Sequence, residues 1–180
     1  MSNLKNIINI FNNNGLVAIP TDTIYGACGN PESEIAVNKL YELKKREKKK
    51  HLSIFVNNYS EIEKICQVSA FAKDFIYNKL ENNTIILPKK DKNYLSYISD
   101  ENIGIRVPNN DFLINLLKEY EKPIFATSIN ISGEDECLYY QDVYARFKND
   151  FDLIVKNDTT PSNKSSSIYK IVNDKIEKIR

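Results

Sequence analysis

Five short apolar segments recur along the chain and alternate with longer segments of helical periodicity. They read LVAIP, LSIFV, NTIILP, IGIRVP and PIFA, and three of them are closed by proline. Short continuous apolar runs of this kind are typical of buried strands. Their alternation with helices predicts an α/β sheet rather than a sandwich or a helical bundle. With 180 residues, of which 42% are hydrophobic, we expect one domain spanning residues 1–180.

The segments between the predicted strands have the pattern of amphipathic helices. Apolar residues recur at helical spacing from Leu4 to Phe11, and the cap-type residue Ser33 precedes the next such segment. Ser60-x-x-Glu63 has the pattern of a capping box that opens a short helix. We expect helices at 4–11, 33–45, 69–80, 109–120 and 143–147, a further strand at 151–155, and a hairpin of 166–172 with 175–180 around Asn173-Asp174.

Positive charge is concentrated in one short run. Six cations surround Glu47 between Lys44 and Lys50, although the whole chain carries a net charge of only +1. The run lies at the end of the predicted helix 33–45, where the helix dipole favours cations, so a solvated helix end is one explanation. The other explanation is that these cations form a clamp for the phosphate groups of a ligand. The local charge indicates a site rather than a basic coat for nucleic acid.

Several classes of protein are excluded by missing motifs. The sequence has no GxxxxGK[ST], GxGxxG, HExxH or GxSxG. Cys28, Cys66 and Cys137 are widely spaced and His51 is the only histidine, so we predict neither a disulfide framework nor a zinc site. We expect Cys28 to be a small buried thiol. Neighbouring cations disfavour protonation of His51, so Ser128 lacks a base and is expected to donate a hydrogen bond rather than act as a nucleophile.

The sequence also bears on location. The amino terminus lacks the basic start and long apolar stretch of a secretory signal. No apolar run approaches the roughly 20 residues that a membrane span needs. We therefore expect a cytoplasmic protein with no membrane partner.

Polar stretches lie at the ends of four predicted strands. They are TDTIYG after LVAIP, Arg106 in IGIRVP, TSIN after PIFA, and SSS before IYKIV. In open α/β sheets ligands collect at strand ends, so these hydroxyl, guanidinium and amide groups are expected to converge on one site.

The same segments carry a family resemblance. PTDTIYG, KKREKKKHLSIFV, IGIRVP, ATSINISG and SSSIYKIV resemble, in order and spacing, the YrdC-like family of threonylcarbamoyl-AMP synthases from about Gly15 to Arg180. The resemblance implies a twisted open mixed α/β sheet with flanking helices around a basic cavity. It also implies a nucleotidyltransferase that makes threonylcarbamoyl-AMP and pyrophosphate from L-threonine, bicarbonate and ATP for the t6A modification of tRNA.

The resemblance further assigns residues to a site. The family's Lys-x-Arg and Ser-x-Asn motifs and a further cation give a catalytic set of Lys44, Arg46, Lys50, Ser128 and Asn130. The ATP contacts implied are Arg46, Lys50, Asn102, Ser128 and Arg180. The threonine contacts implied are Thr23, Arg106, Ala126 and Ser166. Each residue alone has an ordinary structural explanation, such as a turn, an ion pair or a cap, but independent turn residues have no reason to reproduce the family's order.

The implied chemistry needs no protein nucleophile. Threonine's amine attacks bicarbonate or CO2, and the carbamate then displaces pyrophosphate from ATP, so cancellation of charge and positioning are what the site must supply. We expect Mg²⁺ held mainly by the ATP phosphates, and no protein metal site. Further implied partners are the threonylcarbamoyl-transferase proteins that use the product.

Two alternatives remain from the sequence. One is a non-enzymatic module that binds double-stranded RNA or tRNA through the same basic cavity. The other is a carbamoyl-adenylate activity like that of the related domain in hydrogenase-maturation proteins, whose zinc-finger-like cysteines this chain lacks. The chain also departs from the family pattern: Glu47 and His51 replace prolines, so we expect the helix 33–45 to extend, and Phe55 replaces a histidine of some members.

Overall fold

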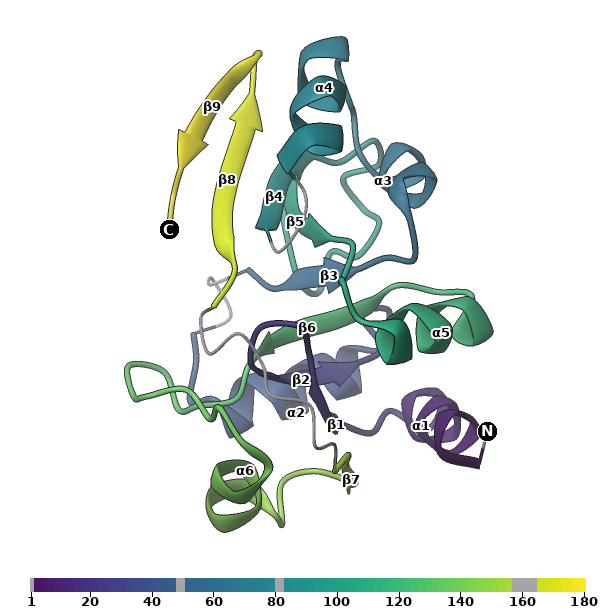
Figure 1. Ribbon diagram of the computed structural model, residues 1–180, viewed down its shortest axis with the longest axis vertical. Helices are drawn as coiled ribbons and strands as arrows, with labels where there is room; N and C mark the ends of the chain where they lie inside the picture. The colour runs from purple at the N-terminus through teal and green to yellow at the C-terminus, as the bar shows by residue number, and fades with distance from the viewer. Residues whose placement is uncertain (1, 48–50, 80–82, 157–164) are drawn as a thin grey trace.

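The computed structural model describes residues 2–47, 51–79, 83–156 and 165–180, and these form a nine-stranded sheet flanked by helices (Figure 1). The strands are β1 (Val17–Pro20), β2 (Tyr25–Gly29), β3 (Ser53–Phe55), β4 (Asn83–Pro88), β5 (Asn102–Arg106), β6 (Ile124–Ser128), β7 (Leu153–Ile154), β8 (Ser167–Val172) and β9 (Lys175–Lys178). The helices are α1 (Ser2–Asn12), α2 (Glu34–Leu43), α3 (Tyr59–Ile65), α4 (Ala70–Lys79), α5 (Asp111–Tyr120) and α6 (Tyr140–Phe147).

The strand order is β7-β1-β2-β6-β3-β5-β4-β8-β9. Parallel pairs (β1 with β7, β3 with β5, β4 with β8) are mixed with antiparallel ones, and β6 pairs antiparallel with both β2 and β3. The predicted class, an open mixed α/β sheet with flanking helices, is confirmed. Among the described helices none is long and apolar enough to cross a membrane.

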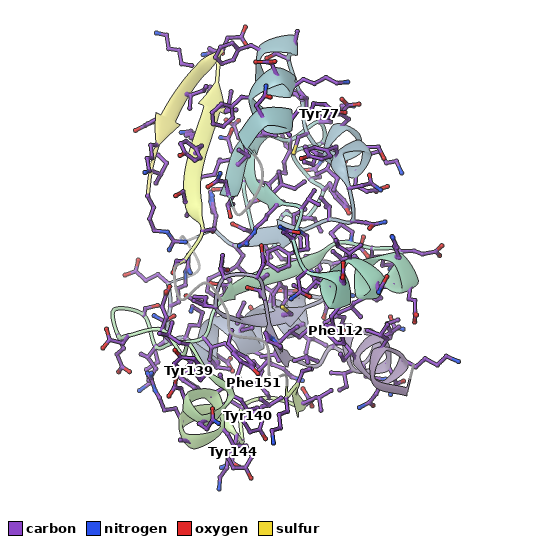
Figure 2. The ribbon with its side chains drawn as sticks, viewed as in Figure 1. Tyr77, Phe112, Tyr139, Tyr140, Tyr144 and Phe151 are labelled. Carbon is purple, nitrogen blue, oxygen red and sulfur yellow. The ribbon has the colours of Figure 1, made fainter. Side chains whose placement is uncertain are left out.

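Helices cover the two faces of the sheet separately. One face packs against α2, α3, α4 and α6 through buried side chains such as Leu40, Ile62, Ile76 and Val143. The other face packs against α1 and α5, where the rings of Phe11 and Tyr120 lie 5.5 Å apart. Figure 2 shows Phe112 where α5 faces α1. This second pair of helices covers only part of its face, because it packs on the strands toward the β1 side of the sheet.

Most predicted elements are present, and the predicted hairpin is confirmed in detail. Strands β8 and β9 pair with Val172 opposite Lys175, so two residues form the turn. Those residues, Asn173 and Asp174, have φ angles of 52° and 54°. Two successive positive φ angles define the type I′ turn that asparagine and aspartate favour.

Two expectations about individual elements are wrong, and one strand was not predicted. The unpredicted strand is β2, which reads YGACG and lacks the apolar pattern. Helix α3 begins after Asn58, whose side chain accepts a hydrogen bond from the Glu61 amide, so the Ser60-x-x-Glu63 capping box does not form. Helix α2 ends at Leu43 instead of extending through the basic run.

The end of α2 has a definite geometry. Lys45 adopts a left-handed φ of 47°, the Lys45 amide donates to the Glu42 oxygen, and the Arg46 amide donates to the Tyr41 oxygen. This pair of bonds is the Schellman motif, which closes a helix. The chain therefore turns sharply within the basic run, and neighbouring cations point in different directions.

Candidate functional site

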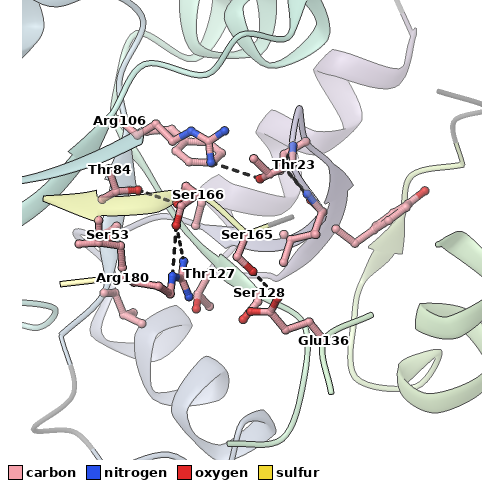
Figure 3. A pocket seen from close by; sticks show the side chains of 18 of the residues that line it. Thr23, Ser53, Thr84, Arg106, Thr127, Ser128, Glu136, Ser165, Ser166 and Arg180 are labelled. Atoms are coloured by element: carbon pink, nitrogen blue, oxygen red, sulfur yellow. Dashed lines mark hydrogen bonds between the residues drawn. The ribbon is translucent and has the colours of Figure 1, made fainter. Parts of the chain in front are cut away.

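A cavity of about 200 Å³ lies on the sheet face that α1 and α5 share, beyond the part that these helices cover (Figure 3). Its lining comes from the turn between β1 and β2, from β3, β4, β5 and β6, and from the segment that enters β8. The lining residues with polar side chains are Thr21, Thr23, Tyr25, Arg46, His51, Ser53, Thr84, Arg106, Thr127, Ser128, Glu136, Ser165, Ser166 and Arg180. The cavity thus gathers three arginines and many hydroxyl groups from segments far apart in the sequence.

Strand register places these side chains on one face. Phe55 is paired with Arg106 across β3 and β5, and Ser128 with Gly26 across β6 and β2. Because side chains alternate along a strand, residues at matched positions of neighbouring strands share a face. Gly104 keeps this face open, since a Cβ there would lie 2.4 Å from the Ser53 hydroxyl oxygen.

Arg106 is fixed by three contacts. Its Nη2 donates to Oδ2 of Asp22 at 2.5 Å, its Nη1 donates to the Thr23 hydroxyl at 3.2 Å, and its guanidinium lies 5.5 Å from the centre of the Phe55 ring. Both charged side chains are buried, with exposed fractions of 4% for Arg106 and 7% for Asp22. Burial lowers the pKa of Arg106, and Asp22 opposes that shift.

The Arg106 guanidinium has more hydrogen-bond donors than its two protein acceptors use. It carries five N–H groups, and its buried Nε has no hydrogen-bond partner among the described residues. Nη1 and Nη2 each give one of their two protons to a protein acceptor, so a second N–H on each is available to an anionic ligand in the cavity that Arg106 lines.

A second group of contacts joins β4, β8 and the chain end. The hydroxyl groups of Thr84 and Ser166 lie 3.1 Å apart, and Arg180 donates from Nε and Nη2 to the Ser166 carbonyl at 3.1 and 3.0 Å (Figure 3). The Ser165 hydroxyl donates to Glu136. These bonds hold the entry to β8 against the cavity.

Arg46 reaches the cavity because α2 ends three residues earlier. Its Nη2 donates to the His51 carbonyl at 2.9 Å, whereas its buried Nε has no partner among the described residues. Burial lowers the pKa of Arg46, and Tyr41 opposes that shift. His51 differs from expectation, because its Nε2 lies 3.0 Å from Oδ2 of Asp100 rather than among cations alone.

Lys44 does not line the cavity. It is 2% exposed, and its Nζ donates to the Ser128 carbonyl at 2.5 Å and to the carbonyl and Oδ1 of Asn130 at 3.2 and 2.8 Å. An ammonium group has three N–H donors, so these acceptors use all of them. Burial and Arg46 lower the pKa of Lys44 from 10.5 to about 8, against the opposing effects of Glu136 and Cys137.

Asn130 completes the same arrangement. Its Oδ1 also accepts from the Ser128 hydroxyl at 3.0 Å, and its Nδ2 donates to the Glu134 carbonyl at 2.8 Å. The amide oxygen thus has both lone pairs in use. Lys44 and Asn130 therefore hold the loop after β6 in shape, and Ser128 is the member of this group that faces the cavity.

The structure brings together seven of the residues that the resemblance implied. Those that line the cavity are Thr23, Arg46, Arg106, Ala126, Ser128, Ser166 and Arg180. Lys44 and Asn130 lie behind it, and Asn102 begins β5 opposite Pro88, away from the lining. Lys50 lies outside the described residues.

Sequence reasoning assigned no individual binding role to eight polar residues of the lining. They are Thr21, Tyr25, His51, Ser53, Thr84, Thr127, Glu136 and Ser165. Thr84 and Ser53 had a usable signal, because each is a hydroxyl residue in or beside an otherwise apolar strand. Glu136 had none, since nothing in the loop sequence shows that it folds back over β6.

Three comparisons place the chain among known proteins. The family model Sua5_yciO_yrdC, described as Telomere recombination, matches residues 9–180. A putative threonylcarbamoyl-AMP synthase of Methanocaldococcus jannaschii is 34% identical over 168 residues, which are 93% of this chain and 80% of that protein.

Two solved structures share the fold. YciO of E. coli matches with a TM-score of 0.89 at 20% identity, covering 99% of this chain and 88% of that one. Sua5 of P. abyssi in complex with L-threonine matches with a TM-score of 0.88 at 23% identity and covers 98% of this chain. This chain spans 53% of that Sua5 chain. Since the family model matches nearly all of its residues, the chain belongs to the Sua5/YciO/YrdC family.

Proposed function

We propose that this protein is an L-threonylcarbamoyladenylate synthase, a nucleotidyltransferase that forms threonylcarbamoyl-AMP and pyrophosphate from L-threonine, bicarbonate and ATP. One observation carries the proposal: Arg46, Arg106 and Arg180 converge on a single hydroxyl-lined cavity in a chain whose curated relatives include threonylcarbamoyl-AMP synthases. The substrates bring a triphosphate and two carboxylate-like groups, which are the groups that arginine binds best.

The amino-acid end of the cavity is at Arg106. Arg106 lines the cavity beside the Thr23 hydroxyl, which suits the α-carboxylate and a neighbouring polar group of an amino acid. Ser166 and the main chain at Ala126 close the same side. A volume of about 200 Å³ is small for a ligand pocket, so the nucleotide extends out past the rim.

The phosphate end is at Arg46, Arg180 and Ser128. Arg46 lines the cavity and gives one N–H of its Nη2 to the His51 carbonyl, and Arg180 is partly held by the Ser166 carbonyl. Ser128 donates to Asn130 in this structure, so it contacts phosphate only if its hydroxyl rotates. Lys44 and Asn130 act by holding this loop rather than by contacting ATP.

The reaction then follows from placement and charge. The threonine amine attacks the carbon of bicarbonate or of CO2 derived from it, and a carbamate oxygen displaces pyrophosphate from the α-phosphorus. No protein nucleophile is needed. The chain aligns the reactants, cancels negative charge with its arginines and shields the labile carbamate from water.

Magnesium fits this site through the substrate rather than through a protein cage. The described residues contain no group of three or more His, Cys, Asp and Glu side chains that could hold a metal ion. Glu136 is the acidic side chain that lines the cavity. Mg²⁺ keeps several waters and takes one or two carboxylates plus phosphates, so Mg²⁺ carried by ATP suits these residues and supplies further charge cancellation.

The product serves the t6A modification of tRNA through separate threonylcarbamoyl-transferase proteins, as the family resemblance implies. The alternative of a non-enzymatic RNA-binding module is not favoured, because the matched curated relatives carry the name of an enzyme.

A pyrophosphate assay tests the proposal. Protein mixed with ATP, L-threonine and bicarbonate should release pyrophosphate only when all three are present. Release that does not need threonine, or no release, contradicts the proposal. Tight binding of double-stranded RNA by the same preparation, without nucleotide-dependent chemistry, would support the RNA-binding alternative instead.

A further inference from the structure

Strand β9 lies at one edge of the sheet, and its residues, Lys175–Lys178, are all exposed (Figure 1). No strand of the described residues pairs with its outer side. Such an edge presents unpaired peptide N–H and C=O groups, to which a strand of another molecule can bind. The order of charges along β9 indicates which strand fits.

The hydrogen bonds to β8 show which peptide groups of β9 face outward. The Ile179 amide donates to the Ile168 carbonyl at 2.8 Å, so it faces β8. The direction of the peptide groups alternates along an antiparallel strand. The N–H and C=O groups of Ile176 and Lys178 therefore point away from β8 and are available to another strand.

The charges of β9 allow it to pair with a second copy of itself in one register. In an antiparallel pair with two-fold symmetry, the central residue lies opposite the same residue of the other copy. Centring the pair on Lys175, Glu177 or Lys178 brings two like charges together, which is destabilising. Ile176 is the uncharged residue of the strand and is 41% exposed, and centring the pair on it brings two isoleucines together.

The register centred on Ile176 also pairs opposite charges. Lys175 of each copy then lies opposite Glu177 of the other, so an ion pair forms on either side of the two isoleucines. These are the positions of an antiparallel pair at which side chains come closest. One residue further out, Lys178 lies opposite Asp174 of the other copy. The peptide groups of the two Ile176 residues face each other and exchange hydrogen bonds.

We propose that two copies of this chain associate through β9, in an antiparallel strand pair centred on Ile176 that joins their sheets. Charges on an edge strand usually prevent such pairing, and here they exclude the other symmetric registers while favouring this one. A strand of four residues buries less surface than the roughly 1,200 Å² of a standard interface, so the dimer is transient. We expect a dissociation constant of about 1 to 100 μM. The inference does not depend on the proposed function.

Sedimentation velocity over a range of protein concentrations tests the proposal, with wild type shifting from monomer to dimer. Lys175→Glu places glutamate opposite glutamate, and Glu177→Lys places lysine opposite lysine. Each variant alone should dimerise at least roughly tenfold more weakly than wild type. Mixed together, the two variants should form a heterodimer with about the wild-type affinity, because every lysine again lies opposite a glutamate.

Glu119→Lys is the matched control, because it makes the same change in net charge as Glu177→Lys at an exposed position of α5. It should keep the wild-type affinity. Wild-type protein that stays monomeric at about 500 μM overturns the proposal. Unchanged affinity in both single variants, or a mixture that associates no better than either variant alone, also overturns it.

Circular dichroism checks that each variant is folded. If either charge variant does not fold, Ile176→Lys takes its place, because this change sets two lysines opposite each other at the centre of the strand pair. Loss of the dimer in Ile176→Lys, with the dimer kept in Glu119→Lys, supports the proposal. Unchanged affinity in Ile176→Lys overturns it.

Discussion

The ammonium nitrogen of Lys44 lies 2.5 Å from the carbonyl oxygen of Ser128, so one buried cation joins the end of α2 to the loop after β6. The same loop returns a bond, because the Ser132 amide donates to the Lys44 carbonyl at 2.8 Å. Lys44 therefore contributes to the site by holding the loop after β6 in shape. Its neighbours differ, because Arg46 lines the cavity and Lys45 is exposed.

Replacing Lys44 by methionine should destabilise the fold. It leaves three carbonyl or amide oxygens without their donor, which costs about 2 kcal/mol or more in unfolding free energy at pH 7. Urea denaturation measures the change. Lys45→Met is the control, because Lys45 is exposed, and it should stay within about 0.5 kcal/mol of wild type. Equal losses in the two variants would show that charge alone matters.

The same pair of proteins should respond differently to pH. The pKa of Lys44 is about 8 in the folded protein, against the ordinary lysine value of 10.5 once the chain unfolds, so the unfolded chain binds more protons between these values. Stability therefore rises with pH across this window, because the cost of burying the charged amine is full below pH 8 and disappears by pH 10.5.

The unfolding free energy of wild type minus that of Lys44→Met should accordingly grow by on the order of 2 to 3 kcal/mol from pH 7 to pH 10. Taking the difference removes the contributions of tyrosines and other lysines that titrate in both proteins. A difference that stays constant or shrinks would mean that the Lys44 amine is not held in a desolvated site.

Arg46→Ala should lose pyrophosphate release without losing the fold. The guanidinium lines the proposed phosphate end of the cavity, and removing such a charge from a preorganised site lowers the rate roughly 10²-fold. Arg146→Ala removes an arginine that pairs with Glu134 outside the cavity, and it should keep activity. Circular dichroism and thermal midpoints check the folded content. Retained activity in Arg46→Ala would remove Arg46 from the phosphate contacts.

Magnesium should bind only together with the nucleotide. Since no described cluster of side chains could hold the ion alone, Mg²⁺ by itself should leave the thermal midpoint unchanged. Mg²⁺ with ATP at 100 times the dissociation constant should raise it by roughly 5 to 10 °C. EDTA should reverse the rise. A rise with Mg²⁺ alone would indicate a protein metal site.

The sequence was enough to predict those strands and turns whose residue pattern is local, that is, set by residues adjacent in the chain. Alternating apolar runs located β1, β3, β4, β5 and β6, and the Asn173-Asp174 pair located the hairpin turn. It failed at β2, where Gly26, Ala27 and Gly29 lack the branched side chains typical of strands. The reason lies across the sheet, because a Cβ at Gly29 would lie 2.5 Å from the Phe125 ring.

The candidate site could be predicted in part, because the positions of some of its residues follow from the strand pattern alone. Thr23, Arg106 and Ser166 lie at strand ends, so a pattern of strands was enough to bring them together. Lys44 and Arg46 are two residues apart, yet one turns inward to the loop and the other toward the cavity. The left-handed backbone conformation of Lys45 turns the side chains of Lys44 and Arg46 apart, and no sequence periodicity predicts that a lysine adopts this conformation.

The strand order has a consequence for how the protein is made. Strands β7 and β8 follow each other in the chain but lie near opposite edges of the sheet, and β8 pairs with β4, whose Thr84 stands opposite Ile168. A ribosome releases β4 long before β8, so the growing chain exposes an unpaired β4 edge in the meantime. The cavity gains Ser166 only when β8 arrives, and the nascent protein is therefore open to mispairing before it can hold its substrates.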